Sequence, residues 1–178
     1  MTCVPATKDV EQVLMAPGGI FDSAKKGTII VDNSTIHPNA SKEFNLEAKK
    51  RGFVYVDAPC SGGITGAKAG TLAFIVGCEE QYIDALKHVM MAMGKHFFHC
   101  GGPGTGSLAK ICNNLTLGIN MIALAEGLSL GEKLGIDPKV LSNIISVSTG
   151  RSWCCDTMNP YPGVMENVPA SKNYQGGY

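Results

Sequence analysis

Hydrophobic residues recur along this chain with two different periods, and the alternation between the two predicts its secondary structure. Short β-branched runs such as 28-TIIV-31 suit buried strands, whereas apolar residues spaced three and four apart suit helices with one buried face. The pattern predicts strands at residues 28–31, 53–59, 72–77 and 95–101. It predicts helices at 7–26, with a break at 17–19, and at 38–51, 79–93, 107–134 and 139–147.

Strands and helices alternate up to residue 101, whereas the rest of the chain is predicted to be helical. This order favours right-handed β-α-β units and a parallel sheet, so the predicted fold class is α/β followed by a helical region. The helix at 107–134 would be roughly 40 Å long at about 1.5 Å per residue, a length that suits a link between two domains. From Thr149 onward, Pro, Gly and Asn are frequent, and no further element is predicted.

Polar residues follow two of the predicted strands, at Asp32 to Thr35 and at Asp57 to Gly63. Ligands of parallel sheets bind at the carboxyl ends of strands, so both clusters are candidate binding residues. Ser61, Gly62 and Gly63 can bring backbone N–H groups close to an anion, because glycine has no side chain in the way. An ordinary glycine-rich hairpin loop before the strand at 72–77 explains the same residues equally well.

The stretch 101-GGPGTGSLAKICNN-114 is a glycine-rich turn that runs into the long helix. Lys110 and Asn114 are four residues apart, so they share one helix face and could present a cation and an amide to a small ligand. From spacing alone, an exposed lysine near a glycine-capped helix start is the more economical interpretation, because lysines are rarely buried.

Composition narrows the possible functions. The 178 residues suit one or two domains, and 15 basic residues balance 15 acidic ones, which gives no basic surface for nucleic acid or for an acidic membrane. Charged or glycine residues interrupt every apolar run that approaches membrane-spanning length. The seven cysteines form no C-x-x-C pair, and His96 and His99 fall on opposite faces of a strand, so we expect reduced thiols and no metal site.

Four stretches together resemble the β-hydroxyacid dehydrogenases. The substrate motif D-A-P-V-S-G-G-x-x-G-A of that family appears as 57-DAPCSGGITGA-67, and its lysine motif G-x-G-x-x-x-K-x-x-N-N appears as 104-GTGSLAKICNN-114. Its D-x-S-T-I-x-P stretch appears as 32-DNSTIHP-38, and the strand end on its nicotinamide side appears as Cys3-Val4-Pro5. The ending 173-NYQGG-177 is also similar. The resemblance extends over nearly the full length.

The resemblance implies a domain order and a set of roles. Residues 1–103 would be the C-terminal half of an NAD-binding, Rossmann-like domain, and 104–178 the interdomain helix with the start of a helical domain. It implies that Lys110 is catalytic and takes the hydroxyl proton during hydride transfer to NAD. Substrate would be bound by Ser61, Gly62, Gly63 and Asn114, and the cofactor would be lined by Val4, Pro5, Asp9 and Thr35. Asp9 stands where close relatives often carry Asn.

The branch that the chain resembles most oxidises 3-hydroxyisobutyrate to methylmalonate semialdehyde in valine breakdown, in the mitochondrial matrix. Reductases of tartronate or succinic semialdehyde are alternatives within the family, and a non-catalytic truncated isoform or oligomerisation module is an alternative outside it. The resemblance further implies a small hydroxyacid as substrate and a homo-oligomer, with no nucleic-acid or membrane partner.

Two features of the family are missing from the 178 residues: the pyrophosphate-binding G-x-G-x-x-G and the later K-D-L-x-x-A helix. The chain also begins as if in the middle of a sheet and stops in a loop at 173-NYQGGY-178, which favours a fragment or a shortened isoform. We therefore expect this polypeptide alone to bind a nicotinamide cofactor weakly and to turn over little substrate.

Overall fold

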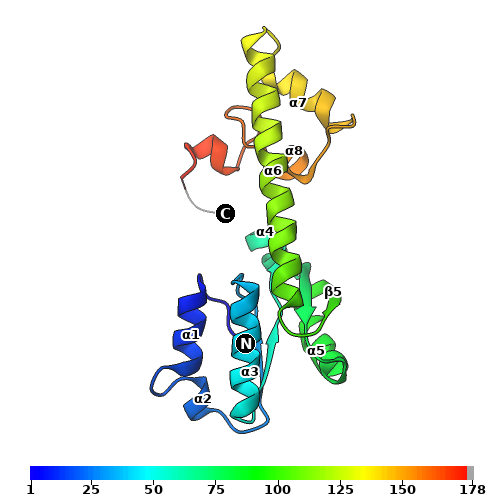
Figure 1. Ribbon diagram of the computed structural model, residues 1–178. Helices are drawn as coiled ribbons and strands as arrows, with labels where there is room; N and C mark the ends of the chain where they lie inside the picture. Colours follow the sequence, from blue (N-terminus) through cyan, green and yellow to red (C-terminus); the bar gives the residue numbers. More distant parts are fainter. Residues whose placement is uncertain (176–178) are drawn as a thin grey trace. The chain divides into compact units, whose positions relative to one another are not determined.

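A five-stranded sheet organises the first part of the chain in this structure, a computed structural model that describes residues 1–175 (Figure 1). β1 (Ile29–Asp32) and β2 (Val54–Asp57) run parallel, with Asp32 opposite Asp57. β4 (Leu72–Gly77) and β5 (Gly94–Gly101) also run parallel to each other. Thr2 adds a parallel bridge to Asp32 at the outer side of β1. The α/β class predicted from the sequence is confirmed for this part of the chain.

The sheet is not parallel throughout, which corrects the sequence-based expectation. β4 runs antiparallel to β2, with Asp57 opposite Gly77, and antiparallel to the short β3 (Cys60–Ser61). The reason is the connection after β2: the chain pairs β3 with β4 as in a hairpin, and α4 (Gly63–Ala69) closes the turn. The glycine-rich segment between the strands predicted at 53–59 and 72–77 therefore holds a short strand and a helix.

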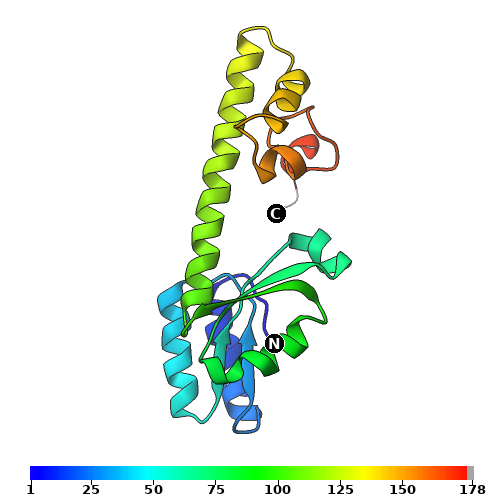
Figure 2. The same ribbon diagram turned by 90° about the vertical axis from the view of Figure 1, so that its right-hand side faces the viewer.

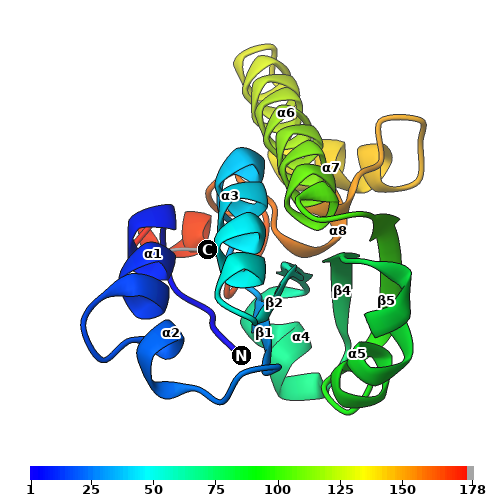
Figure 3. The same cartoon turned by 60° about the horizontal axis from the view of Figure 1, so that its bottom comes forward.

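Helices cover both faces of the sheet, and the period-two alternation of its strands explains why. Ile30 and Tyr55 point to one face, where they pack with residues of α1 (Thr7–Met15), α2 (Ile20–Ser23) and α3 (Pro38–Lys50). Val31 and Val56 point to the other, where they pack with α5 (Ile83–Met90), which follows the 3-10 turn Glu80–Tyr82. Figure 3 shows α3 and α5 on the two sides of the strands. This first unit comprises Met1–Cys112.

The second unit, Asn113–Tyr178, is helical. The long helix α6 (Thr105–Lys133) begins in the first unit and continues into the second, within two residues of its predicted bounds. α7 (Pro138–Ser146) and α8 (Trp153–Thr157) pack against its later half around Leu124, Leu128, Cys154 and Cys155 (Figure 2). The 3-10 turn Pro169–Lys172 follows. The predicted resemblance at Gly176 and Gly177 lies outside the described residues.

Asp137 caps α7, because its Oδ1 accepts from Lys139 N and Val140 N at 2.7 and 3.2 Å. α8 was not predicted, since five residues are too few to show a helical period.

By length and composition, α6 could also cross a membrane: an 18-residue window within it has a mean hydropathy of 1.3 and is 6% buried. The core helix of a helical domain has the same composition, so one such helix is weak evidence for a membrane span.

Candidate functional site

The carboxyl edge of the sheet in the first unit brings the predicted site residues of that unit into two neighbouring groups. β1 and β2 end level with each other at Asp32 and Asp57, and the segment after Thr2 leaves the sheet at the same level. One group of candidates follows Thr2 and β1, and the other follows β2. Both therefore lie where ligands of such sheets bind.

The cofactor-side candidates are Val4, Pro5, Asp9 and Thr35. Two hydrogen bonds hold their segments together: Val4 N donates to Ser34 Oγ at 2.9 Å, and His37 N donates to Thr7 Oγ1 at 3.4 Å. Pro5 and Thr35 are exposed, whereas Val4 and Asp9 are half-buried, Asp9 within the first turn of α1. These residues form a short ledge with both polar and apolar surface.

Asp32, at the end of β1, holds the two segments that carry these residues in place. Its carboxylate accepts from Thr2 Oγ1 at 2.9 Å, from Ser34 N at 3.0 Å and from Tyr55 Oη at 2.8 Å, and only 1% of Asp32 is exposed. Burial, reinforced by the Asp32 charge, raises the pKa of the Tyr55 phenol, so Tyr55 stays a hydrogen-bond donor. Asp32 thus has a supporting role and does not face a ligand.

The substrate-side candidates Ser61, Gly62 and Gly63 lie where β3 passes into α4. Ser61 is half-buried, and both glycines are exposed. Gly62 and Gly63 have φ values of +132° and +57°, which side chains rarely adopt, so glycine is required for this turn. The turn exposes backbone to solvent beside Ser61, as a carboxylate-binding loop requires.

Lys110 is the lysine on which the sequence resemblance depends, and the structure buries it. It lies in the part of α6 that belongs to the first unit, and it is 9% exposed. Burial lowers the pKa of the Lys110 ammonium, and the nearby Cys60 thiol opposes that effect. Within residues 1–175, no carboxylate forms an ion pair with Lys110. Lys110 therefore interacts electrostatically with Cys60, the first residue of β3.

Asn114, the remaining substrate-side candidate, lies one turn after Lys110 on α6 and is exposed. Its Oδ1 accepts a long hydrogen bond of 3.4 Å from Asn113 Nδ2. Asn114 belongs to the second unit, so its role as a substrate ligand stays a prediction.

Asp57 is a residue whose contribution sequence reasoning missed, although it begins the substrate motif. It is 1% exposed, and its two carboxylate oxygens accept from Gly104 N at 2.7 Å and Ser107 N at 2.8 Å, at the start of α6. Burial raises the pKa of the Asp57 carboxyl, and these two backbone donors oppose that rise. A helix start with glycine in place of a capping side chain was the available signal.

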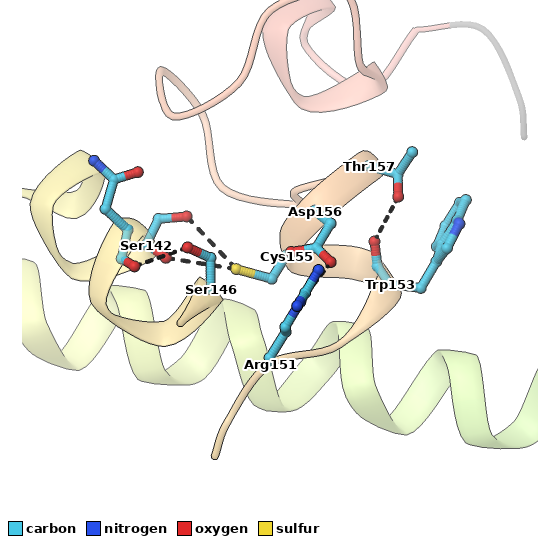
Figure 4. A network of polar contacts seen from close by, with 8 residues as sticks. Ser142, Ser146, Arg151, Trp153, Cys155, Asp156 and Thr157 are labelled. Carbon is cyan, nitrogen blue, oxygen red and sulfur yellow. Dashed lines mark hydrogen bonds and ion pairs between the residues drawn. The ribbon is translucent and has the colours of Figure 1, made fainter. Parts of the chain in front are cut away.

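The second unit has a cavity of about 420 Å³ of its own, between α7, α8 and the loop that follows. Figure 4 shows the polar contacts beside it, including Ser142 with Cys155 and the Arg151–Asp156 ion pair. None of the sequence-predicted site residues lines this cavity. In the described part of the chain, every buried side-chain nitrogen or oxygen has a partner, so nothing in this cavity marks a ligand position.

Over residues 1–175, no group of three or more His, Cys, Asp or Glu side chains is arranged to hold a metal ion. All seven cysteines are free thiols.

Two family descriptions match the chain in sequence order. The NAD-binding domain of 6-phosphogluconate dehydrogenase matches residues 1–102, and the NAD-binding region of NADP-dependent 3-hydroxyisobutyrate dehydrogenase matches residues 104–175.

Relatives of known name match along the whole chain. Mitochondrial 3-hydroxyisobutyrate dehydrogenase of Mus musculus is 46% identical over 178 residues, which are all of this chain and 53% of the mouse protein. An NAD-dependent L-serine dehydrogenase of Pseudomonas aeruginosa is 40% identical over the same span, 60% of its own length. The chain therefore spans little more than half the length of the curated relatives it matches.

Solved structures show the same fold. A 3-hydroxyisobutyrate dehydrogenase of Mycobacterium tuberculosis with L-serine matches with a TM-score of 0.86 and 35% identity, over 99% of this chain and 60% of that one. Psf3 in complex with NADP+ and 2-OPP matches with a TM-score of 0.80 and 29% identity, over 86% of this chain and 55% of that one.

Proposed function

This chain belongs to the β-hydroxyacid dehydrogenase family, and from that premise we propose that it carries the substrate and proton-transfer half of an NAD-dependent 3-hydroxyisobutyrate dehydrogenase. The observation that carries the proposal is Lys110, a buried lysine without a carboxylate partner among residues 1–175, which interacts electrostatically with Cys60 just before the Ser61–Gly63 turn. The reaction is the oxidation of 3-hydroxyisobutyrate to methylmalonate semialdehyde, a step of valine breakdown.

The cofactor of this family is a nicotinamide dinucleotide, which takes up the hydride when bound. The ledge formed by Val4, Pro5, Asp9 and Thr35 fits one side of such a group, because it is open and mixes apolar with polar surface. The pyrophosphate-binding G-x-G-x-x-G is not among the 178 residues, so we propose that these residues line only the nicotinamide side.

Lys110 would accept the hydroxyl proton as the alcohol carbon loses its hydride. An amine can act as a base only when it is uncharged, and burial favours the uncharged form. The lowered pKa of Lys110 therefore supports this role.

Ser61 and the backbone of Gly62 and Gly63 would hold the substrate carboxylate, since together they offer a hydroxyl and N–H donors without crowding. Asn114 would orient the substrate relative to Lys110. A carboxylate at the Ser61–Gly63 turn and a hydroxyl at the lysine describe a small hydroxyacid, and the names of the relatives point to 3-hydroxyisobutyrate.

L-serine is also a 3-hydroxyacid, and relatives are named for L-serine or were solved with it. Substrate choice therefore needs a direct comparison. Reductases of tartronate or succinic semialdehyde belong to the same comparison, because their alcohol products are hydroxyacids too.

A chimera tests the proposal. The segment of the mouse enzyme that aligns with this chain is replaced by these 178 residues, and NADH formation is followed with 3-hydroxyisobutyrate, L-serine and the other hydroxyacids. We expect activity that is highest with 3-hydroxyisobutyrate and that falls by about 1,000-fold or more in Lys110→Ala, the range seen when a proton-transfer group is lost. Full activity of the Lys110→Ala chimera would contradict the role of Lys110.

A second experiment measures cofactor binding by the 178-residue chain alone. Calorimetric titration with NAD should show binding weaker than micromolar, because the pyrophosphate motif is not in the sequence. Micromolar binding would show that this expectation is wrong.

We further propose a location in the mitochondrial matrix and a homo-oligomeric state. The location follows from relatives that are named as mitochondrial. The oligomer follows from apolar side chains on α6 that are exposed, among them Leu115, Ile119 and Ile122.

A further inference from the structure

We infer that Asp57 is a positioning residue for Lys110: its carboxylate fixes the first turn of α6 and thereby sets where Lys110 stands at the carboxyl edge of the sheet. The inference rests on the proposed function for the importance of Lys110, but the contacts that define it are independent of any activity. All of them lie in the unit Met1–Cys112.

The first step concerns the start of α6, where backbone N–H groups lack partners within the helix. Helices usually satisfy them with a Ser, Thr, Asp or Asn side chain placed just before the helix. Here that place is taken by Gly104, with φ of +86° and with Lys42 Cγ only 2.7 Å from where a Cβ would lie. A local capping side chain is therefore excluded.

Asp57 replaces the missing cap from another element. It is the last residue of β2, and each of its oxygens takes one N–H of the helix start, from Gly104 and from Ser107. A carboxylate that accepts two backbone N–H groups forms charge-assisted bonds, which are stronger than neutral ones. The bonds join the strand that leads to the substrate loop directly to the helix that carries Lys110.

The packing around this joint leaves it little freedom. A Cβ on Gly106 would collide with Ile75 O and would lie 2.8 Å from Gly77 N, so glycine is needed for α6 to touch β4. On the other side, Ser107 Oγ shares a buried hydrogen bond of 2.9 Å with Ser41 Oγ of α3. The first turn of α6 is thus in contact with β2, β4 and α3.

Lys110 comes three residues after Ser107, which is about one helical turn. Because a helix is stiff over one turn, a change in the anchor at Ser107 moves the Lys110 side chain with it. The burial of Lys110, which lowers its pKa, therefore depends on the anchor at Asp57.

The variant Asp57→Asn tests the inference in the 178-residue chain. Asparagine has nearly the same shape, but its NH2 group faces a backbone N–H where a carboxylate oxygen had accepted. The readout is the pKa of Lys110, followed through its 13Cε chemical shift with pH and assigned with Lys110→Arg. We expect that pKa to rise toward the ordinary lysine value, because a loosened helix start exposes the ammonium.

The direction of this shift separates positioning from simple electrostatics. Removal of a nearby negative charge lowers the pKa of a lysine, whereas loss of burial raises it. A pKa that falls or stays unchanged in Asp57→Asn would overturn the inference.

Asp137→Ala is the control for general loss of stability, because it removes the carboxylate that caps α7 in the other unit. We expect the pKa of Lys110 to be unchanged in that variant. An equal rise in both variants would assign the effect to destabilisation alone and would reject the positioning role.

Amide hydrogen exchange gives a second readout: the Gly104 and Ser107 amides should exchange about tenfold faster or more in Asp57→Asn than in the unmodified chain. If Asp57→Asn does not fold, the unmodified chain is titrated with acid, and the Gly104, Ser107 and Lys110 signals should shift together as Asp57 takes up its proton. A Lys110 signal that stays fixed while the Gly104 amide shifts would refute the link.

The outcomes distinguish this inference from the proposed function. An active Lys110→Ala chimera with a raised Lys110 pKa in Asp57→Asn would reject the proposed function and keep the anchor. An inactive Lys110→Ala chimera, together with an unchanged Lys110 pKa in Asp57→Asn, would support the proposed function and reject the positioning role of Asp57.

Discussion

At the scale of single residues, Lys110 shows how tertiary structure can override a reasonable expectation. Spacing alone favoured an exposed lysine, because most lysines are solvated. The structure leaves 9% of it exposed, close to the thiol of Cys60. A buried ammonium without a carboxylate partner in the described chain lowers stability, and such residues persist where they serve a function.

This burial predicts that Lys110→Met stabilises the chain. In the folded state the pKa of Lys110 is below its unfolded value, so between those two values the unfolded state binds more protons and stability rises with pH. Below the folded-state pKa the penalty for charging Lys110 is present in full. At pH 7 we therefore expect Lys110→Met to raise the free energy of unfolding by about 1 kcal/mol, measured by urea denaturation.

The advantage of Lys110→Met should shrink as the pH rises through the lowered pKa of Lys110 toward the ordinary lysine value. The matched control is Lys68→Met, an exposed lysine of α4, which should leave stability unchanged. Equal effects of the two substitutions would show that burial of Lys110 is not the cause.

At the scale of elements, the contact between α6 and β4 depends on the absence of two side chains. Gly106 and Gly77 face each other there, and a Cβ on Gly106 would lie 2.7 Å from Asp57 O and 2.8 Å from Gly77 N. Backbone atoms on both sides leave no flexible group to move aside.

We predict that Gly106→Ala lowers the free energy of unfolding by about 2–3 kcal/mol, as overpacking of a close contact does. Gly102→Ala is the control, because a Cβ at Gly102 meets nothing within 4 Å. Thermal unfolding of both variants, followed by circular dichroism, checks the difference. A Gly106→Ala variant as stable as Gly102→Ala would mean that α6 and β4 separate without cost.

A second element-scale prediction concerns the cap of α7. Asp137→Ala removes the acceptor for Lys139 N and Val140 N, so we expect a loss of about 1 kcal/mol in urea denaturation. Asp137→Asn keeps a side-chain oxygen and should lose less. Equal losses in the two variants would indicate that charge, and not the hydrogen bonds, provides the stabilisation.

Helices of several turns could be predicted from the sequence, whereas elements of one or two turns could not. The helix at 38–51 and the long helix were found because their apolar spacing repeats over several turns, with Pro38 marking one start. α4 has seven residues with three glycines or alanines among its first five, and α8 has five residues, so neither offers a repeat. The direction of β4 depended on how β3 pairs, which no local pattern records.

At the scale of the whole molecule, the candidate site was predictable as far as it lies in continuous motifs. Ser61 to Gly63 and Lys110 could be named from the sequence because motifs hold their neighbours in order. The link from Asp57 to Gly104 and Ser107 could not, since it spans 47 and 50 residues and appears only once β2 and α6 have met.

The apolar surface of α6 predicts self-association of the chain. Leu115, Ile119 and Ile122 are exposed by 64%, 58% and 64%, and they recur at helical spacing within the second unit. Analytical ultracentrifugation should show dimers or larger species at micromolar concentration. Replacement of Ile119 and Ile122 by lysine should shift the chain to monomer.

Asn120→Lys supplies the control for that experiment, because Asn120 is also exposed on α6 but is polar. It should leave the association constant nearly unchanged. A chain that sediments as a monomer at every concentration would exclude this surface as a contact between copies.

The cap that reaches from β2 to α6 also constrains the order in which the chain folds. The first turn of α6 has no capping side chain of its own at Gly104, so we expect it to fray until it contacts the carboxylate of Asp57, 47 residues earlier in the chain. Domains emerge from the ribosome with their N-terminal part first, and β2 can pair with β1 before α6 is complete. The helix that carries Lys110 is therefore completed by contact with a strand that was synthesised before it, and we expect Lys110 to reach its final position late in folding.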